Sequence, residues 1–116
     1  MLKAGIIGLG KMGLSHAAIV APHKDVDLVA VCDTSSLILD GIRKFTGIKV
    51  YDDYRKMIDS EKLDFVIVAT PTKFHFPMVK YALEKGVHTF CEKPFSLSIK
   101  EGEEMVSLAE KNNLVN

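Results

Sequence analysis

Short apolar runs alternate with amphipathic stretches along the whole chain. Residues 2–8 (LKAGIIG) and 27–33 (DLVAVCD) form compact apolar runs that are typical of strands. Residues 64–70 (DFVIVAT) carry five apolar residues in succession, without the alternation of a half-exposed strand. A strand that is apolar on both faces indicates a parallel sheet with helices on both sides. Two shorter strands are predicted at residues 48–51 and 87–91.

Helical patterns separate these strands. Helices are predicted at residues 13–22, 35–45 and 75–85, after Asp52 or Asp53, and from Ser98 onward, where Glu101 completes a capping box. In the second helix, Ile38, Gly41, Ile42 and Phe45 fall on one face. The alternation predicts one α/β domain, residues 1–116, with the doubly wound parallel sheet of the Rossmann fold. Residues 112–116 (NNLVN) look like the start of a sixth strand.

A glycine motif follows the first strand directly. Residues 8–13 read G-L-G-K-M-G, which matches G-x-G-x-x-G, and a predicted helix opens from them. Alone, this pattern also describes an ordinary tight turn. However, an acidic residue, Asp33, ends the second strand about 20 residues after Gly13. The preceding strand, the following helix and the acidic residue together favour a dinucleotide-binding loop over an ordinary tight turn.

Each glycine of the motif has a different role in a dinucleotide-binding loop. Gly8 permits the tight turn, Gly10 lets a pyrophosphate approach the backbone, and Gly13 lets the helix pack close to the strand. The helix start, which includes Lys11 and Met12, then points free N–H groups and the positive end of its dipole at the phosphates.

Asp33 bears on the choice of cofactor. Its carboxylate can accept hydrogen bonds from both hydroxyls of the adenosine ribose, and it repels a 2′-phosphate. No arginine or lysine follows it before Arg43. The sequence therefore favours NAD over NADP, although some acidic sites accept both cofactors.

Polar residues follow the fourth and fifth predicted strands. Thr70 and Pro71 come after the fourth strand, and Glu92, Lys93 and Pro94 come after the fifth. Because ligands of open α/β sheets bind beyond the carboxyl ends of the strands, we expect these residues to lie along one edge of a crevice.

The combination of GLGKMG, ATPTKFH and CEKP resembles the glucose–fructose oxidoreductase, inositol dehydrogenase and rhizopine-catabolism (Gfo/Idh/MocA) family. The similarity covers essentially all 116 residues, and the E-K-P tripeptide is its most discriminating element. It implies an NAD(P)-dependent oxidoreductase that acts on a hydroxyl of a sugar, sugar nucleotide or cyclitol. It also implies a larger C-terminal α/β substrate domain, which we expect to be absent from this chain.

The resemblance implies roles for the residues after the fifth strand. Lys93 would lie beside the substrate hydroxyl and the nicotinamide, where it would relay a proton or stabilise developing alkoxide charge. We expect partial burial to lower the pKa of this lysine. Glu92 would face the nicotinamide end of the cofactor or orient Lys93. Pro94 would fix the turn, with a cis Lys93–Pro94 bond as one option.

The resemblance also implies that Thr70 and Pro71 line the path of the cofactor. His75, near the start of the following helix, would sit beside the cofactor, or it would simply be satisfied by backbone groups. For His16 and His23, a structural or solvent-facing position is favoured over a catalytic one.

Composition narrows the function classes. The chain has 15 basic and 15 acidic residues, so no excess of positive charge indicates a nucleic-acid partner. The apolar runs are far shorter than the roughly 20 residues that cross a bilayer. Cys32 and Cys91 lack the spacing of a metal site, so we expect reduced thiols in a cytoplasmic protein without a metal.

Two functions remain open at this stage. The first is the nucleotide-binding domain of a dehydrogenase, with a small polyol or sugar as substrate, no membrane partner and homo-oligomers as one assembly state. The second is a non-catalytic sensor or scaffold module that binds NAD(P). Lys93 favours the enzyme, because a pure binder has no need of a lysine there. The expected lack of a substrate domain favours the module, and the isolated chain is expected to be inactive.

Overall fold

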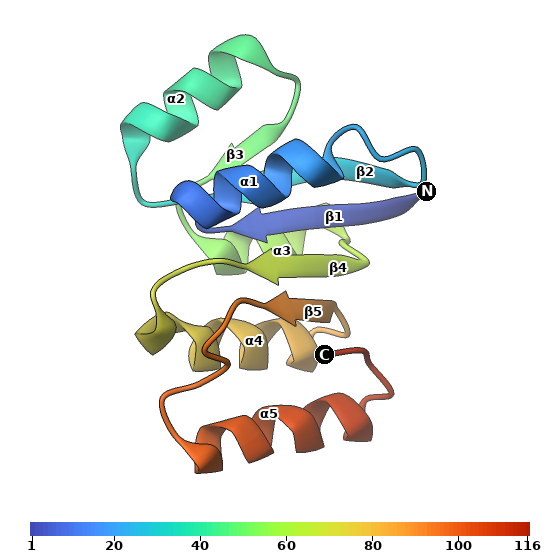
Figure 1. Ribbon diagram of the computed structural model, residues 1–116. Coiled ribbons are helices and arrows are strands. Elements are labelled where there is room, and N and C mark those ends of the chain that lie inside the picture. The colour runs from blue at the N-terminus through green and yellow to red at the C-terminus, as the bar shows by residue number, and fades with distance from the viewer.

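A central sheet with helices on both faces forms the protein, as the computed structural model of residues 1–116 shows (Figure 1). Strands and α-helices alternate along the chain, and a short 3₁₀ helix, η1, precedes the fourth α-helix. In chain order the elements are β1 (Leu2–Ile7), α1 (Lys11–Val20), β2 (Val26–Cys32), α2 (Ser36–Phe45), β3 (Lys49–Tyr51), α3 (Tyr54–Glu61), β4 (Phe65–Val68), η1 (Thr72–Phe74), α4 (His75–Glu84), β5 (His88–Cys91) and α5 (Ile99–Lys111). None of the helices has the length and apolar character needed to cross a membrane.

All strand pairings in the sheet are parallel, and the strand order is β3-β2-β1-β4-β5. The sequence prediction of a doubly wound parallel sheet is therefore confirmed. The order reverses between β1 and β4, because β2 and β3 lie on one side of β1, and β4 and β5 lie on the other. Since the strands are parallel, the chain leaves all of them at one edge of the sheet.

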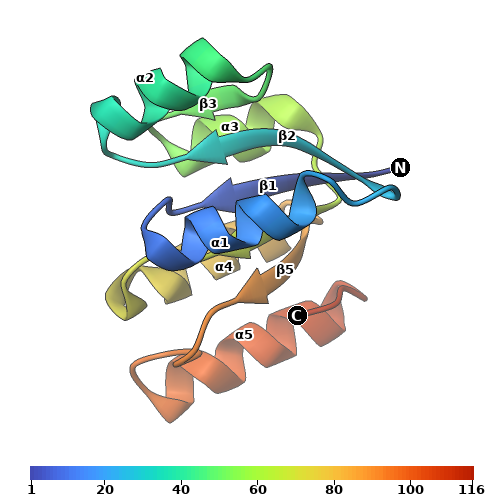
Figure 2. The same cartoon turned by 45° about the horizontal axis from the view of Figure 1, so that its top comes forward.

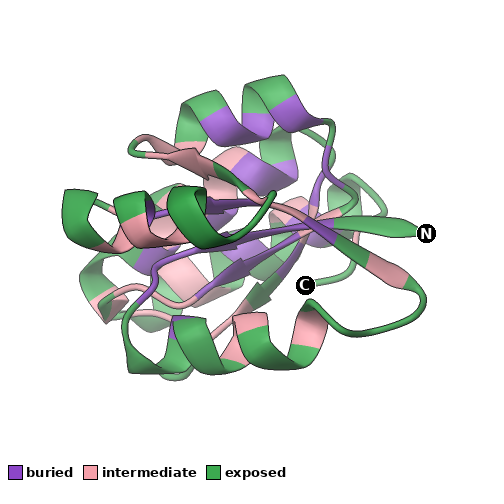
Figure 3. Ribbon diagram, turned by 90° about the horizontal axis from the view of Figure 1, so that it is seen from above, coloured by how far each residue is buried: buried purple, intermediate pink, exposed green.

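Helices cover both faces of the sheet (Figure 2), and buried residues gather along the strands between them (Figure 3). One core contains Met57 and packs against α3, α4 and α5, and the other contains Leu39 and packs against α1 and α2. Val66 and Val68 of β4 belong to the first core, whereas Ile67 between them belongs to the second. This division explains why the strand is apolar without alternation.

The inner face of α2 differs from the one that the sequence predicts. Leu39 is buried, and Ile38 and Ile42 are partly buried against the same core. Phe45 is 80% exposed instead of packed inward. It is the last residue of the helix, and its ring contacts the Lys44 ammonium, 5.5 Å from the ring centroid, rather than the core.

Two features predicted near the C-terminus, a capping box at Ser98 and a sixth strand, are only partly formed or absent. At the start of α5, Ser98 Oγ accepts a hydrogen bond from Glu101 N at 3.1 Å, but no bond returns from the Glu101 side chain to Ser98. Only half of the capping box is therefore present. Residues 112–116 lie beside β5 without forming a strand. Val115 N donates to the His88 side chain, and the one backbone hydrogen bond to β5 is from Thr89 N to Val115 O.

Candidate functional site

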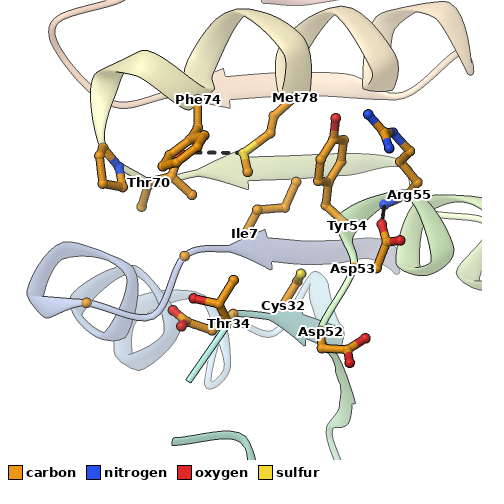
Figure 4. A pocket seen from close by; sticks show the side chains of 15 residues that line it. Ile7, Cys32, Thr34, Asp52, Asp53, Tyr54, Arg55, Thr70, Phe74 and Met78 are labelled. Carbon is orange, nitrogen blue, oxygen red and sulfur yellow. Dashed lines mark hydrogen bonds between the residues drawn. The ribbon is translucent and has the colours of Figure 1, made fainter. Parts of the chain in front are cut away.

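A pocket of about 630 Å³ opens at the carboxyl ends of β1, β2 and β4 (Figure 4). It lies where the strand order reverses, which is the usual ligand position in an open α/β sheet. The sequence-predicted residues that line it are Gly8, Gly10, Asp33, Thr70 and Pro71. The pocket has the size of a small-molecule or cofactor site.

Two glycines of the loop are required by the fold itself. Gly8 has φ +97°, and a Cβ atom on it would lie 2.6 Å from the carbonyl oxygen of Ala69. A Cβ atom on Gly13 would lie 1.7 Å from the carbonyl oxygen of Gly8. Both contacts are with backbone, which cannot move aside, so the close approach of β1, α1 and β4 depends on these two glycines.

Gly10 is different. A Cβ atom on Gly10 would meet nothing within 4 Å, and its φ of −71° suits any residue. Neither packing nor backbone conformation therefore requires a glycine at this position. Gly10 is exposed and is one of the residues that line the pocket.

The start of α1 is left without a capping side chain. By contrast, a side-chain hydroxyl or carboxylate caps the start of α2, α3 and α5, from Ser35, Asp53 and Ser98 respectively. The N-cap of α1 is a glycine, no acidic residue lies in its first turn, and Lys11 and Met12 are exposed. The first N–H groups of the helix thus remain available to an anion.

Asp33 connects the glycine loop with the turn after β2. One carboxylate oxygen accepts a hydrogen bond from Leu9 N at 2.6 Å, and the other accepts one from Ser35 N at 2.8 Å. These two bonds hold the carboxylate at the wall of the pocket, next to the backbone of the loop. Both oxygens keep further lone pairs that can accept from a ligand.

Two further acids, which the sequence predicts only as helix caps, lie near Asp33. Asp52 and Asp53 follow β3 and line the pocket (Figure 4). Asp33 lines the same pocket from the end of β2. Burial, and then the charges of these three carboxylates, raise the pKa of the Cys32 thiol to about 12. The field at this end of the pocket is therefore negative. The signal was present in the sequence, because both acids directly follow a predicted strand.

The opposite wall comes from the segment after β4. Thr70 and Pro71 continue into Phe74 of η1 and Met78 of α4, and Thr70 Oγ1 donates a hydrogen bond to Met78 Sδ at 3.5 Å (Figure 4). Tyr54 closes the pocket from α3. These side chains make the wall largely apolar, in contrast to the acidic side near β2 and β3.

His75 does not line the pocket. Its side chain is buried, with Nδ1 3.0 Å from Pro94 O and Nε2 2.9 Å from Thr70 O. The ring thus lies between the segments that follow β4 and β5. This arrangement corresponds to the alternative in which backbone groups satisfy the histidine.

The residues after β5 lie beside the segment after β4. Glu92 N donates to Val68 O at 3.0 Å, which extends the pairing of the two strands. The Lys93–Pro94 peptide bond is cis. Lys93 is exposed, which corrects the expectation of a partly buried lysine. Neither Glu92 nor Lys93 lines the pocket.

The remaining histidines and thiols have structural environments. His16 Nε2 lies 2.6 Å from Glu92 Oε1, whereas His23 is exposed and accepts a hydrogen bond from Asp25 N. Both cysteines are free, and burial is the main reason that the pKa of Cys91 is also raised to about 12. Such thiols are poor nucleophiles at neutral pH.

This strand order, with a glycine loop at the start of α1 and an acidic residue at the end of β2, defines a Rossmann domain of the nucleotide-binding class. The family model described as "Oxidoreductase family, NAD-binding Rossmann fold" (GFO_IDH_MocA) matches residues 2–116. The chain belongs to this Gfo/Idh/MocA family.

Individual relatives agree with this assignment. The chain superimposes with a TM-score of 0.91 and 32% identity on scyllo-inositol dehydrogenase from Lactobacillus casei, which was solved with bound NAD(H) and scyllo-inositol. The TM-score is 0.88 and the identity 38% for myo-inositol 2-dehydrogenase from Lactobacillus plantarum. A glycosyl hydrolase family 109 protein from Shewanella baltica is 32% identical over 96% of this chain.

The matched regions are parts of longer proteins. The chain is covered to 98% and 96% by the two dehydrogenases, but it spans only 34% and 33% of their chains. It spans 26% of the Shewanella relative. The similarity is thus to about a third or less of each of these proteins.

Proposed function

We propose that this protein is the NAD-binding domain of a dehydrogenase that oxidises a secondary hydroxyl of a sugar, sugar nucleotide or cyclitol. The observation that carries the cofactor part is Gly10, a pocket-lining glycine that neither the packing nor the backbone conformation of the fold requires. A phosphate group that approaches the backbone here would explain the glycine, because any larger side chain would block it.

The pocket orients the dinucleotide by its charges. The uncapped start of α1 receives the pyrophosphate, because the free N–H groups and the helix dipole attract an anion. The ribose hydroxyls of the adenosine half donate to Asp33, which stands at the end of β2. The nicotinamide half then extends past Thr70 toward the ends of β4 and β5, where Lys93 lies.

The acids at the adenosine end favour NAD over NADP. Asp33, Asp52 and Asp53 all lie on this side of the pocket, and Arg55 is the one cationic residue among the pocket walls. A 2′-phosphate would bring two further negative charges toward three carboxylates. The preference for NAD therefore has two sources: its ribose hydroxyls form hydrogen bonds with Asp33, and the carboxylates repel the 2′-phosphate of NADP.

Lys93 handles the proton of the reaction. Oxidation moves a hydride from the carbinol carbon to the nicotinamide, and the hydroxyl proton must leave at the same stage. The Lys93 amine accepts this proton, or its ammonium form stabilises the alkoxide before the proton leaves. The relatives support this class of substrate, since scyllo-inositol carries only secondary hydroxyls and glycosyl hydrolases act on glycosides.

The remaining substrate contacts would come from a second domain, because Lys93 is exposed and lies outside the pocket beside the glycine loop. A sensor or scaffold that binds NAD without turnover is the second candidate. It needs the glycine loop and Asp33, but it gives no reason for a lysine at the end of β5.

Replacing Gly10 by alanine is expected to separate binding from folding. The added methyl group meets no protein atom within 4 Å, so the melting temperature should stay within a few degrees of that of the parent. Because the methyl occupies the space of the pyrophosphate, NAD affinity should fall about tenfold or more. Calorimetric titration with NAD, together with thermal unfolding, measures both quantities.

Gly41→Ala is the matched control. A Cβ atom on Gly41 also meets nothing within 4 Å, but this residue lies in α2, away from the pocket. This variant should bind NAD like the parent and should be slightly more stable, since alanine favours the helix by about 0.5–1 kcal/mol. If Gly10→Ala binds NAD as tightly as Gly41→Ala does, the pyrophosphate does not bind at this loop.

A further inference from the structure

A side-chain hydrogen bond joins α1 to the end of β5. His16 Nε2 lies 2.6 Å from Glu92 Oε1, although the two residues are 76 positions apart in the sequence. The side chains are only 18% and 17% exposed, so water screens the contact less than it screens a pair on the open surface. α1 otherwise lies over β1, β2 and β4.

Each partner of this pair is held by a further contact. The His16 ring packs edge-on against Phe90, with 5.5 Å between the ring centroids and 65° between the planes. Glu92 Oε2 accepts a hydrogen bond from Lys93 N at 3.3 Å, and Glu92 N donates to Val68 O. The Glu92 carboxylate therefore bridges the imidazole of α1 and the backbone of the residue that follows it.

The charges around Glu92 agree with this bridge. The hydrogen bond from His16 is the main cause that lowers the pKa of Glu92, and the backbone N–H and the charge of Lys93 act in the same direction. The titratable and charged groups that face this carboxylate are thus the His16 imidazole from α1 and Lys93 from its own segment. The carboxylate form, which accepts both hydrogen bonds, is the favoured one.

We propose that His16 is a positioning residue for Lys93. It holds Glu92 in the orientation that places the Lys93 backbone, so that the α1 helix which receives the pyrophosphate also locates the lysine that handles the proton. This inference rests on the proposed function, and it assigns Glu92 to orienting Lys93 rather than to contacting the cofactor. Without the imidazole, Oε1 has no donor in the protein, and the segment after β5 loses its link to α1.

His16→Leu tests this role, because leucine keeps the apolar contact with Phe90 but removes the donor. In the full gene product, kcat should fall about tenfold, whereas the KM and Kd for NAD should change less than about twofold. His16→Gln should restore kcat to within about threefold of the parent, because the amide Nε2 can donate to Glu92 from a similar position. A residue that only stabilised the fold would not be rescued in this way.

A double-mutant cycle shows whether the effect passes through Glu92. In a Glu92→Ala background, His16→Leu should lower kcat by less than about twofold further. In the 116-residue chain, a ¹³C titration of the Glu92 carboxyl should give a higher pKa for His16→Leu than for the parent. His23→Leu makes the same chemical change at an exposed histidine and should alter none of these values.

The outcomes separate this inference from the proposed function. An unchanged kcat in His16→Leu, independent effects of the two substitutions, or an unchanged Glu92 pKa would each overturn the role of His16 while NAD binding and the dependence on Lys93 remain. If the parent fails to bind NAD, the proposed function fails first. In that case the carboxyl titration alone decides whether His16 controls Glu92.

Discussion

Lys93→Ala is expected to lower turnover about a thousandfold in the full gene product, while the affinity for NAD stays within about twofold of the parent value. The loss follows from the reaction, because the substrate hydroxyl then has no amine that takes its proton. NAD affinity survives because Lys93 does not line the pocket of the dinucleotide. Steady-state kinetics of both directions, together with calorimetric titration of NAD, measure the two effects.

Lys100→Ala supplies the control for this experiment. Lys100 is an exposed lysine near the start of α5, so its removal changes the net charge equally but leaves the end of β5 unaltered. It should keep the kcat of the parent. A Lys93→Ala variant that retains activity would exclude the lysine from the mechanism, and it would strengthen the alternative of a binding module.

Asp33→Ala is expected to weaken NAD about thirtyfold and to bring NADP binding close to the remaining NAD affinity. The variant loses two acceptors for the ribose hydroxyls, and it loses the charge that repels a 2′-phosphate. It also leaves Leu9 N and Ser35 N without their partner, so thermal unfolding must accompany the binding measurement. Calorimetric titration with NAD and with NADP gives the ratio of the two affinities.

Two variants separate charge from structure at this position. Asp33→Asn keeps an acceptor in place but removes the negative charge, so it should improve NADP binding with a smaller loss of NAD affinity. Asp40→Ala removes an exposed acid that is paired with Arg43, outside the pocket, and should leave the ratio unchanged. Equal affinity of the parent for NAD and NADP would contradict the assigned preference.

Much of the fold follows from local patterns in the sequence. Every residue of the run at 65–68 is apolar, because successive side chains point into two cores that are both buried. A strand without polar positions of this kind indicates a parallel sheet. The helix starts at Ser35, Asp53 and Ser98 are also local features, since each side chain caps an N–H group within three residues. Such signals need no knowledge of the tertiary structure.

The site was only partly predictable, because some of its features arise between distant segments. The glycine loop and Asp33 have a known spacing, so they could be placed together from the sequence. The contact between His16 and Glu92 joins residues that no spacing rule connects. The position of His75 between two backbone carbonyls likewise depends on how the ends of β4 and β5 meet.

Differences in exposure have the same origin. Phe45 fits the apolar face of α2 by periodicity, but it lies in the last turn of the helix, where no core residue meets it. Lys93 was expected to be partly buried, yet burial requires a second element over the end of β5. Periodicity describes one element and cannot report which neighbours surround it.

The central claim is that a dinucleotide binds across the glycine loop of this chain. Addition of NAD to the ¹⁵N-labelled protein tests it most directly, with amide chemical shifts as the readout. We expect the largest shifts at residues 8–13, at Asp33 and Thr34, and at Ala69 and Thr70, while α5 remains unperturbed. Shifts confined to other surfaces, or none at millimolar NAD, would contradict the claim.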